Sequence, residues 1–342
     1  MTDGEIRLLK GQEVITLLEG RERELMEQVA RAYQAHGGGA SSLPHSTFLR
    51  FPDEPGNRII ALPAYLGAEF DIAGIKWVSS FPGNLQQGLD RASAVIILNS
   101  AQTGRPRAII EGSIISAKRT AASAALAAVT LSKARSLHTV GLIGCGLINF
   151  EITRFLTAAS DEVERLVIFD KGAERAEHFR DKCGQLREGI KVEIVGDVES
   201  VLERASLVSL ATTAATPHIH DLSRCREGSV LLHISLRDLS PEAILDCDNV
   251  VDDIDHVARA QTSIHLAEQL SGSRDFVRCT LADILNRTSP ARINDTAITV
   301  FSPFGLGVLD LAVAKLVCDL ADEGGVGTLI ESFLPASWTE TA

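Results

Sequence analysis

Apolar and polar residues follow two different periods in the first third of the chain. Between Gln12 and His36 the apolar residues recur at helical spacing and end at a run of glycines, which predicts one helix. Short runs with strand alternation follow, separated by turn clusters rich in Pro, Gly and Asn. The predicted strands are Thr47–Phe51, Arg58–Leu62, Asp71–Val78, Ala94–Leu98 and Arg107–Ile110. They predict a mostly antiparallel sheet, followed by an Ala-rich helix from Ser113 to Ser132.

From residue 138 onward the pattern changes to strands that alternate with helical segments. The predicted strands are Thr139–Ile143, Leu166–Phe169, Lys191–Val195, Ser206–Ala211, Ser229–Ile234, Asn249–Val251 and Ala297–Phe301. Strands separated by helices are typical of a doubly wound parallel sheet. A last helix, from about Val308 to Asp322, has an apolar face that suits packing against the N-terminal sheet.

These patterns predict an α/β protein with two domains, which its 342 residues can fill. Residues 1–132, completed by the C-terminal helix at 308–342, form an α+β substrate-binding and dimerisation domain with a mostly antiparallel sheet. Residues 133–307 form a Rossmann domain. The first domain has many strand edges for its size, and we expect these edges to be covered in a homodimer.

Composition narrows the possible partners. A formal net charge of −12 and 5% aromatic residues argue against nucleic acid. No apolar run approaches the ~20 residues of a membrane span, so we expect no membrane partner. The six cysteines are scattered, and the N-terminus lacks a basic start with an apolar core; both features favour a cytoplasmic protein with reduced thiols.

A glycine-rich turn after the strand Thr139–Ile143 is the clearest chemical motif. Gly144 permits a tight turn, Gly146 allows a pyrophosphate to approach the backbone, and a helix opens with Leu147 and Ile148. Asp170 ends the next strand, where a carboxylate can hold ribose hydroxyls, so we expect NAD as cofactor. The alternative is an ordinary turn with Asp170 as a solvated strand end. Asn149 departs from the fingerprint, which prefers Gly or Ala there.

Cations inside apolar stretches are the second signal. Their positions are Arg58, Lys76, Arg91 and Arg119. Converging from separate strands, they would form a pocket for a substrate with several carboxylates, because guanidinium groups match carboxylates in bidentate fashion. The alternative is that each one reaches the surface or pairs with a local Asp or Glu.

Polar residues at predicted strand ends form a third group. Asp238 follows a strand and could act as a base or orient water, although it could equally cap a helix before Ser240. Thr212 and Thr213 end another strand, where small hydroxylated residues can approach a cofactor; the alternative is a plain loop start. We expect no metal site at His218 and His220 or in the acidic stretch 252–256, because neither offers a complete ligand set.

Together these motifs resemble the ornithine cyclodeaminase/mu-crystallin family over nearly the whole chain. The pieces that carry the resemblance are Arg58-x4-Pro63, Gly74-Ile-Lys76-Trp77, Arg119-Thr-Ala-Ala, Gly144-Cys-Gly146, Ala211-Thr-Thr213, Asp238 and Gly305-Leu-Gly307-x2-Asp310-Leu. The resemblance implies a dimer in which Arg58, Lys76 and Arg119 meet the substrate carboxylate and Asp238 is the acid/base. It also implies that Ser235 and Gly305 border the NAD site.

Within that family, the chain most resembles a branch whose amino-acid substrate carries three carboxylates. The block Asp90-Arg91-Ala-Ser93 supplies an extra cation, and Ser235-Leu-Arg237-Asp238 replaces a GGD-type stretch, so that Arg237 would repel the terminal ammonium of ornithine. This implies NAD-dependent cleavage of a glutamate Cα–N bond to 2-oxoglutarate and 2,3-diaminopropionate, with Asp238 as proton shuttle. The alternatives are a cyclodeaminase or imino-acid reductase, and a catalytically silent nucleotide-binding protein.

Overall fold

The computed structural model describes residues 4–132 and 137–335, which divide into two compact units. The first comprises Met1–Arg21, Ala35–Arg119 and Leu306–Ala342, and the second comprises Glu22–Gln34 and Thr120–Gly305. The division falls inside the Ala-rich helix, whereas the sequence suggested residue 132 at its end. That helix has no break at which an apolar pattern could mark the change of unit.

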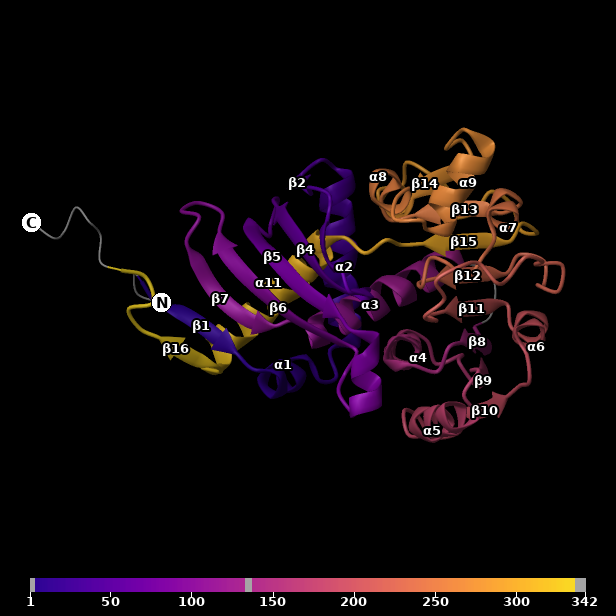
Figure 1. Ribbon diagram of the computed structural model, residues 1–342, viewed down its shortest axis with the longest axis horizontal. Coiled ribbons are helices and arrows are strands. Elements are labelled where there is room, and N and C mark those ends of the chain that lie inside the picture. Colours follow the sequence, from indigo (N-terminus) through magenta and orange to yellow (C-terminus); the bar gives the residue numbers. More distant parts are fainter. Residues whose placement is uncertain (1–3, 133–136, 336–342) are drawn as a thin grey trace, which may run out of the picture. The chain divides into compact units, whose positions relative to one another are not determined.

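An eight-stranded, mostly antiparallel sheet forms the first unit (Figure 1). Its order is β16-β1-β7-β6-β5-β4-β2, with β3 also paired to β4, and only β1 and β7 run parallel. The strands are β1 (Ile6–Leu9), β2 (Ser41–Ser42), β3 (Thr47–Phe51), β4 (Glu54–Leu66), β5 (Ile72–Ser80), β6 (Ala92–Ser100), β7 (Pro106–Glu111) and β16 (Thr328–Ile330). The helical segments of this unit are α1 (Gly11–Leu18), η1 (Pro82–Gln87) and α11 (Gly307–Gly324).

Helix α11 covers one face of this sheet over β4, β5 and β6. The pairing Leu62↔Lys76↔Ile96 puts these three side chains on a common face. A Cβ built on Gly74 of that face would lie 2.4 Å from the carbonyl oxygen of Ile97 and 3.0 Å from the Leu311 side chain. The helix therefore packs directly over β5, as the apolar pattern of the C-terminal helix predicts.

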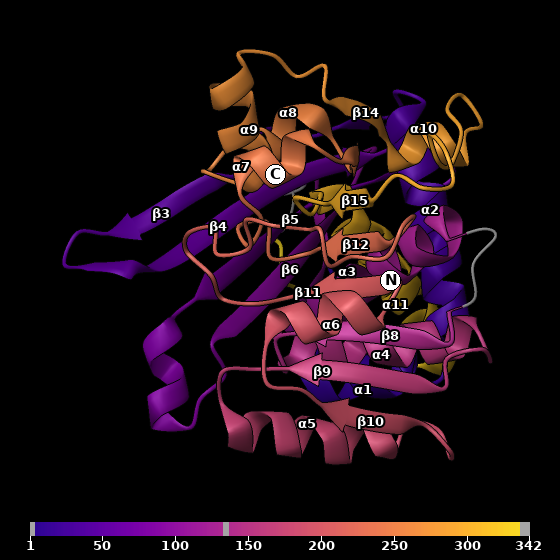
Figure 2. The same cartoon turned by 90° about the vertical axis from the view of Figure 1, so that its right-hand side faces the viewer.

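A parallel sheet forms the second unit, in the order β10-β9-β8-β11-β12-β15-β13-β14 (Figure 2). The strands are β8 (Thr139–Ile143), β9 (Arg165–Phe169), β10 (Lys191–Ile194), β11 (Leu207–Leu210), β12 (Val230–His233), β13 (Asp248–Val251), β14 (Val277–Thr280) and β15 (Thr299–Ser302). The helices are α4 (Leu147–Ala159), α5 (Ala173–Gly184), α6 (Val198–Arg204), α7 (Pro241–Leu245), α8 (Ile254–Val257), α9 (Ser263–Ser271) and α10 (Leu281–Leu285). Strand order reverses between β8 and β11, which is where such sheets bind ligands at their carboxyl ends.

Two helices run through the division of the units, α2 (Glu22–Gly37) and α3 (Ser113–Leu131). By length and composition α3 could cross a membrane, but 72% of its apolar window is buried inside the structure. A core helix that is apolar on all sides has the same composition.

The elements differ from the predictions mainly where no apolar run marks them. The single helix predicted over Gln12–His36 is two helices, because the chain turns at Gly20 with a φ of 71°. The short strands β1, β2, β14 and β16 were not predicted. The other strands of the parallel sheet, by contrast, lie within a residue or two of their predicted bounds.

Candidate functional site

The first candidate site is the turn from β8 to α4. Gly144 has a φ of 94°, and a Cβ built on it would lie 2.6 Å from the carbonyl oxygen of Ala211, so only glycine fits there. A Cβ on Gly146, just before α4, would meet nothing within 4 Å. Leu147 opens the helix and is 64% exposed, and Ile148 is partly buried. An open backbone at a helix N-terminus is a suitable cradle for a pyrophosphate.

Asp170, just after β9, is tied to this cradle. Its carboxylate accepts the backbone N–H of Cys145 at 2.8 Å and that of Gly172 at 2.8 Å. Arg175 lies 3.8 Å from the same carboxylate, with a side chain that is 62% exposed. Each carboxylate oxygen can accept two hydrogen bonds, so capacity remains for ribose hydroxyls.

Hydrogen bonds explain why Asn149 occupies a position where the dinucleotide fingerprint prefers Gly or Ala. Its buried amide donates to the carbonyl oxygens of Ile143 at 3.0 Å and Gly144 at 2.7 Å, and its oxygen accepts the Ser209 hydroxyl at 2.7 Å. Close packing of a small residue is thus replaced by hydrogen bonds that fasten α4 to β8 and β11.

A fully buried carboxylate, Asp238, lies beyond the carboxyl end of β12. One oxygen accepts the Thr212 hydroxyl and lies 3.1 Å from Nε2 of His218. The other oxygen accepts the Ser235 hydroxyl. The turn that brings these groups together holds Leu236 at a φ of 68°, a left-handed conformation that costs a branched residue energy and is typical of functional sites.

The surroundings of Asp238 fix its protonation state. Burial alone would raise its pKa, but the hydrogen-bonding groups of His233, Ser235 and Thr212 outweigh burial and hold the pKa well below its usual range. Nε2 of His233 accepts the backbone N–H of Asp238 at 3.1 Å, and it lies 3.5 Å from the carboxylate. A nitrogen that accepts an N–H carries no proton, so we assign the low pKa chiefly to the two hydroxyl donors.

The other predicted cofactor residues have different surroundings. Thr213 is exposed, whereas the Cα of Thr212 lies 3.4 Å from a Cβ built on Gly144, beside the cradle. Gly305 has a φ of 95°, and its N–H donates to Asp252 at 2.7 Å. Asp253 caps helix α8. Asp252 and Asp253 therefore accept hydrogen bonds from backbone N–H groups.

The second candidate site is a charge cluster in the first unit, formed by β5, α3 and α11. Nζ of Lys76 lies 2.7 Å from one carboxylate oxygen of Asp310, and Nε of Arg119 lies 2.9 Å from the other. Lys76 also donates to the Ser116 hydroxyl at 3.0 Å. Asp310 is fully buried and Lys76 is 2% exposed. Asp310 belongs to one of the motifs that carry the family resemblance, but the sequence analysis assigned it no role. An acid inside an apolar helix could have indicated a buried ion pair.

This cluster retains binding capacity. Two cations and one carboxylate give Lys76, Arg119 and Asp310 a combined charge of +1. Burial lowers the pKa of Lys76 to about 8, the attraction of Asp310 opposes this, and repulsion from Arg119 adds to it. Two of the three ammonium donors meet Asp310 and Ser116, which leaves one for a ligand.

The other two predicted cations lie farther out. Arg58 pairs across the strands with Ser80, on the face that carries Lys76, and four residues along β5 correspond to roughly 13 Å. Arg91 is partly buried and lies just before β6, where its carbonyl oxygen accepts the N–H of Phe81 at 2.8 Å. Arg237 donates to the carbonyl oxygen of Ala260 at 2.7 Å, which gives it a structural partner and weakens the argument that it repels ornithine.

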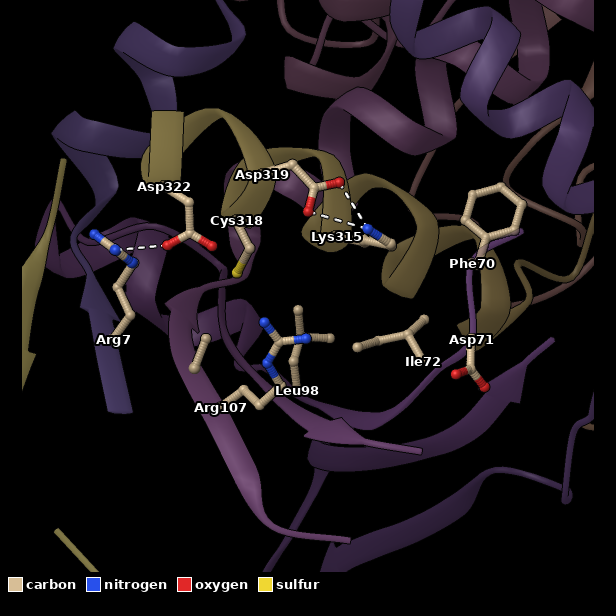
Figure 3. A pocket seen from close by; sticks show the side chains of 11 residues that line it. Arg7, Phe70, Asp71, Ile72, Leu98, Arg107, Lys315, Cys318, Asp319 and Asp322 are labelled. Atoms are coloured by element: carbon tan, nitrogen blue, oxygen red, sulfur yellow. Dashed lines mark hydrogen bonds and ion pairs between the residues drawn. The ribbon is translucent and has the colours of Figure 1, made fainter. Parts of the chain in front are cut away.

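Two hollows lie outside these sites. Figure 3 shows one in the first unit, with a volume of about 40 Å³, enough for water but not for an amino acid. Two ion pairs line it, Arg7 with Asp322 at 2.6 Å and Lys315 with Asp319 at 2.7 Å. The other, of about 590 Å³, lies where β8, β9 and β10 begin, at the edge opposite the cradle.

Comparison with known proteins yields one family. The model of the ornithine cyclodeaminase/mu-crystallin family matches residues 8–325. Among curated relatives, the N-((2S)-2-amino-2-carboxyethyl)-L-glutamate dehydrogenase of Staphylococcus aureus is 29% identical, over 90% of this chain and 93% of the relative.

Solved structures share the fold over almost the whole chain. The Thermococcus litoralis Delta(1)-pyrroline-2-carboxylate reductase, in complex with NADH and L-proline, is 27% identical, with a TM-score of 0.86 over 94% of this chain and 99% of that one. An archaeal alanine dehydrogenase dimer with bound NAD is also 27% identical, with a TM-score of 0.86 over 96% of this chain and 99% of that one.

Proposed function

This chain belongs to the ornithine cyclodeaminase/mu-crystallin family, and on that premise we propose that it is an NAD-dependent oxidoreductase that acts on CH–NH donors. The reaction we propose converts N-((2S)-2-amino-2-carboxyethyl)-L-glutamate, NAD and water to 2-oxoglutarate, L-2,3-diaminopropionate and NADH. The observation that carries it is the net cationic cluster at Lys76 and Arg119, on the sheet face that also holds Arg58. The similarity to the Staphylococcus aureus dehydrogenase supports the choice of substrate.

The β8–α4 turn fits a dinucleotide. Gly144 and Gly146 leave the backbone open, the N-terminus of α4 favours a phosphate charge, and Asp170 has acceptor capacity for ribose hydroxyls. When bound, NAD would accept the hydride from the substrate Cα. A carboxylate at Asp170 disfavours a 2′-phosphate, so we propose NAD over NADP.

The chain's own groups bind and orient the substrate. Arg119 and Lys76, held rigid by Asp310, would bind one carboxylate, and Arg58 and Arg91 would bind the others. Fixing the carboxylates fixes the direction of the Cα–H bond, which is a positional contribution to the rate. With a pKa of about 8, Lys76 is mostly an ammonium at neutral pH and is also suited to proton transfer.

Product stoichiometry tests this proposal. Supplied with the glutamate–diaminopropionate conjugate and NAD, the enzyme should form one 2-oxoglutarate and one NADH per turnover, read by mass and by nicotinamide absorbance. A cyclodeaminase instead returns the hydride to its intermediate, so it releases ammonia and accumulates no NADH. Ornithine consumption with that second pattern, or inertness towards the conjugate, would refute the proposal.

Other dehydrogenases and reductases of the family remain the alternative function. The solved relatives that bind NADH with L-proline, or NAD alone, share the fold at the same identity. Incubation with L-alanine and NAD, and with Delta(1)-pyrroline-2-carboxylate and NADH, distinguishes these from the conjugate reaction by product mass.

We further propose a cytoplasmic homodimer, joined through the sheet face that α11 does not cover. On that face the pairing Ala61↔Trp77↔Val95 places apolar side chains together, and Trp77 is 40% exposed. Exposed apolar faces of this kind mark interfaces. Light scattering should give twice the chain mass, Trp77→Glu should give the monomer, and Leu270→Glu on α9 should not. A monomeric wild type at micromolar concentration would refute the dimer. Six free cysteines support the cytoplasmic assignment.

A further inference from the structure

A partly exposed imidazole is attached to the buried carboxylate of the second unit. Nε2 of His218 lies 3.1 Å from Oδ1 of Asp238, and the side chain of His218 is 30% exposed while that of Asp238 is fully buried. The backbone N–H groups of His218 and Ile219 both donate to the carbonyl oxygen of Asp238 at 2.9 Å. The loop is therefore held against Asp238 by its backbone as well as by the ring.

This arrangement lies beside the dinucleotide cradle. Asp238 accepts the hydroxyl of Thr212, and Thr212 lies against Gly144. Within this connected group, Asp238 and His233 are fully buried, whereas His218 reaches solvent.

Asp238 is poorly suited to take a proton itself. Both of its oxygens already accept hydrogen bonds, from Thr212 and Ser235, and no part of the residue is exposed. A buried carboxylate in such surroundings instead fixes the tautomer and orientation of an adjacent imidazole. With Nε2–H donating to Asp238, the lone pair of Nδ1 is left for a proton from water.

We propose that His218, oriented by Asp238, is the general base that activates the hydrolytic water, an inference that rests on the proposed function. After oxidation at Cα the substrate is a ketimine. The water oxygen bonds to Cα while its proton passes to Nδ1 of His218. The imidazolium then protonates the nitrogen, which gives the carbinolamine. The carbinolamine hydroxyl gives its remaining proton to Nδ1 and becomes the carbonyl as the Cα–N bond breaks, and His218 passes that proton to the departing amine, which gives 2-oxoglutarate and diaminopropionate. The step consumes one water and leaves the imidazole as it began.

Single-turnover kinetics separate this role from a structural one. In His218→Ala the first NADH per site should form at nearly the wild-type rate, and 2-oxoglutarate should then appear on the order of 10²-fold more slowly. The unhydrolysed ketimine should be trapped by borohydride. Added imidazole should restore hydrolysis in His218→Ala. His220→Ala, two residues away in the same loop, is the matched control and should behave as wild type.

Two results would overturn the proposal. One is hydrolysis in His218→Ala within threefold of wild type. The other is that His218→Ala slows NADH formation as much as hydrolysis, or binds NAD more weakly, and that imidazole does not restore it. That pattern indicates a structural role. Asp238→Asn tests whether Asp238 positions His218. This variant should lose hydrolysis, and added imidazole should not restore it.

Failure of the proposed function is recognised separately. A wild type inert towards the conjugate refutes the substrate, and the variants are then compared on L-alanine, whose imine also requires hydrolysis. Independently of any substrate, ¹⁵N NMR of the labelled histidines should find the Nε2–H tautomer of His218 at pH 8, and Asp238→Asn should change it. The Nδ1–H tautomer in the wild type would overturn the proposal.

Discussion

Replacing Asp310 with Asn should destabilise the first unit more than any exposed substitution on the same helix. The carboxylate is fully buried and bridges Lys76 at 2.7 Å and Arg119 at 2.9 Å. Asn preserves shape and some polarity but removes the charge, so two cations remain in a low-dielectric region without a counter-ion. Burial already lowers the pKa of Lys76 to about 8, which shows how poorly the site accommodates an uncompensated ammonium.

The magnitude follows from the burial of both partners. Removing one member of a buried ion pair typically costs about 3–5 kcal/mol, because the other charge is left desolvated. For domains of this size that corresponds to a decrease in Tm on the order of 10 °C. Lys76 can relieve part of this cost by losing its proton, since its pKa falls further without Asp310, so we expect the lower end of the range above pH 8.

Urea denaturation and thermal melts at pH 7 measure the effect. Asp319→Asn is the control, because Asp319 lies on the same helix and pairs with Lys315 in a 52% exposed position. Such a surface pair is worth about 0.3–0.5 kcal/mol. Adding Lys76→Met to Asp310→Asn should recover part of the loss, since one of the stranded charges is removed. Equal stability of the Asp310 and Asp319 variants, or no recovery in the double variant, would refute the reasoning.

Three further variants test the substrate and cofactor assignments. The pKa of Lys76 is about 8 in the folded chain, against an ordinary value of 10.5. The protein should therefore gain stability relative to Lys76→Met as pH rises from 8 to 10.5, and its affinity for the substrate should fall above pH 8. Melting temperatures and kinetic constants that do not change with pH would contradict this. Asp170→Ser should raise the ratio of kcat/KM for NADP over NAD by roughly tenfold, and equal use of both cofactors by the wild type would defeat it. Arg91→Ala should raise the substrate KM by roughly 30-fold, or about 2 kcal/mol, while leaving the Kd for NAD unchanged; Arg50→Ala is the control, and a change below threefold would remove Arg91 from the site.

The sequence predicted the parallel sheet better than its edges. Buried parallel strands are continuous apolar runs, so β8 was predicted with the bounds that the structure has, Thr139–Ile143. Strand β16 exists only through its pairing with β1, Ile6↔Ile330, across almost the whole chain. A local pattern cannot reveal a partner so distant in the sequence. Strand β14 was missed for a related reason, because its Arg278 interrupts the apolar run and is stabilised by Asp248, a residue of another strand, at 2.6 Å.

The candidate sites show the same limit. Spacing located Gly144 and the cations inside apolar strands, because glycine and buried charge are locally unusual. It could not locate the partner of Lys76, because Asp310 lies on a helix at the far end of the chain. The alternative that each cation pairs with a local Asp or Glu does not describe Lys76 and Arg119, because both pair with Asp310, which is distant in the sequence and close only in space.

The surroundings of Asp238 bear on its predicted role as the acid/base. A carboxylate is the conventional proton acceptor, yet hydrogen bonds hold the pKa of Asp238 far below neutrality, so it stays ionised and accepts protons poorly at pH 7. Efficient proton transfer needs a group poised near the working pH. Lys76, with a pKa of about 8, meets that requirement. In the mechanism proposed above, Asp310, 2.7 Å from Nζ of Lys76, and Asp238, 3.1 Å from Nε2 of His218, are the fixed charges that position Lys76 and His218.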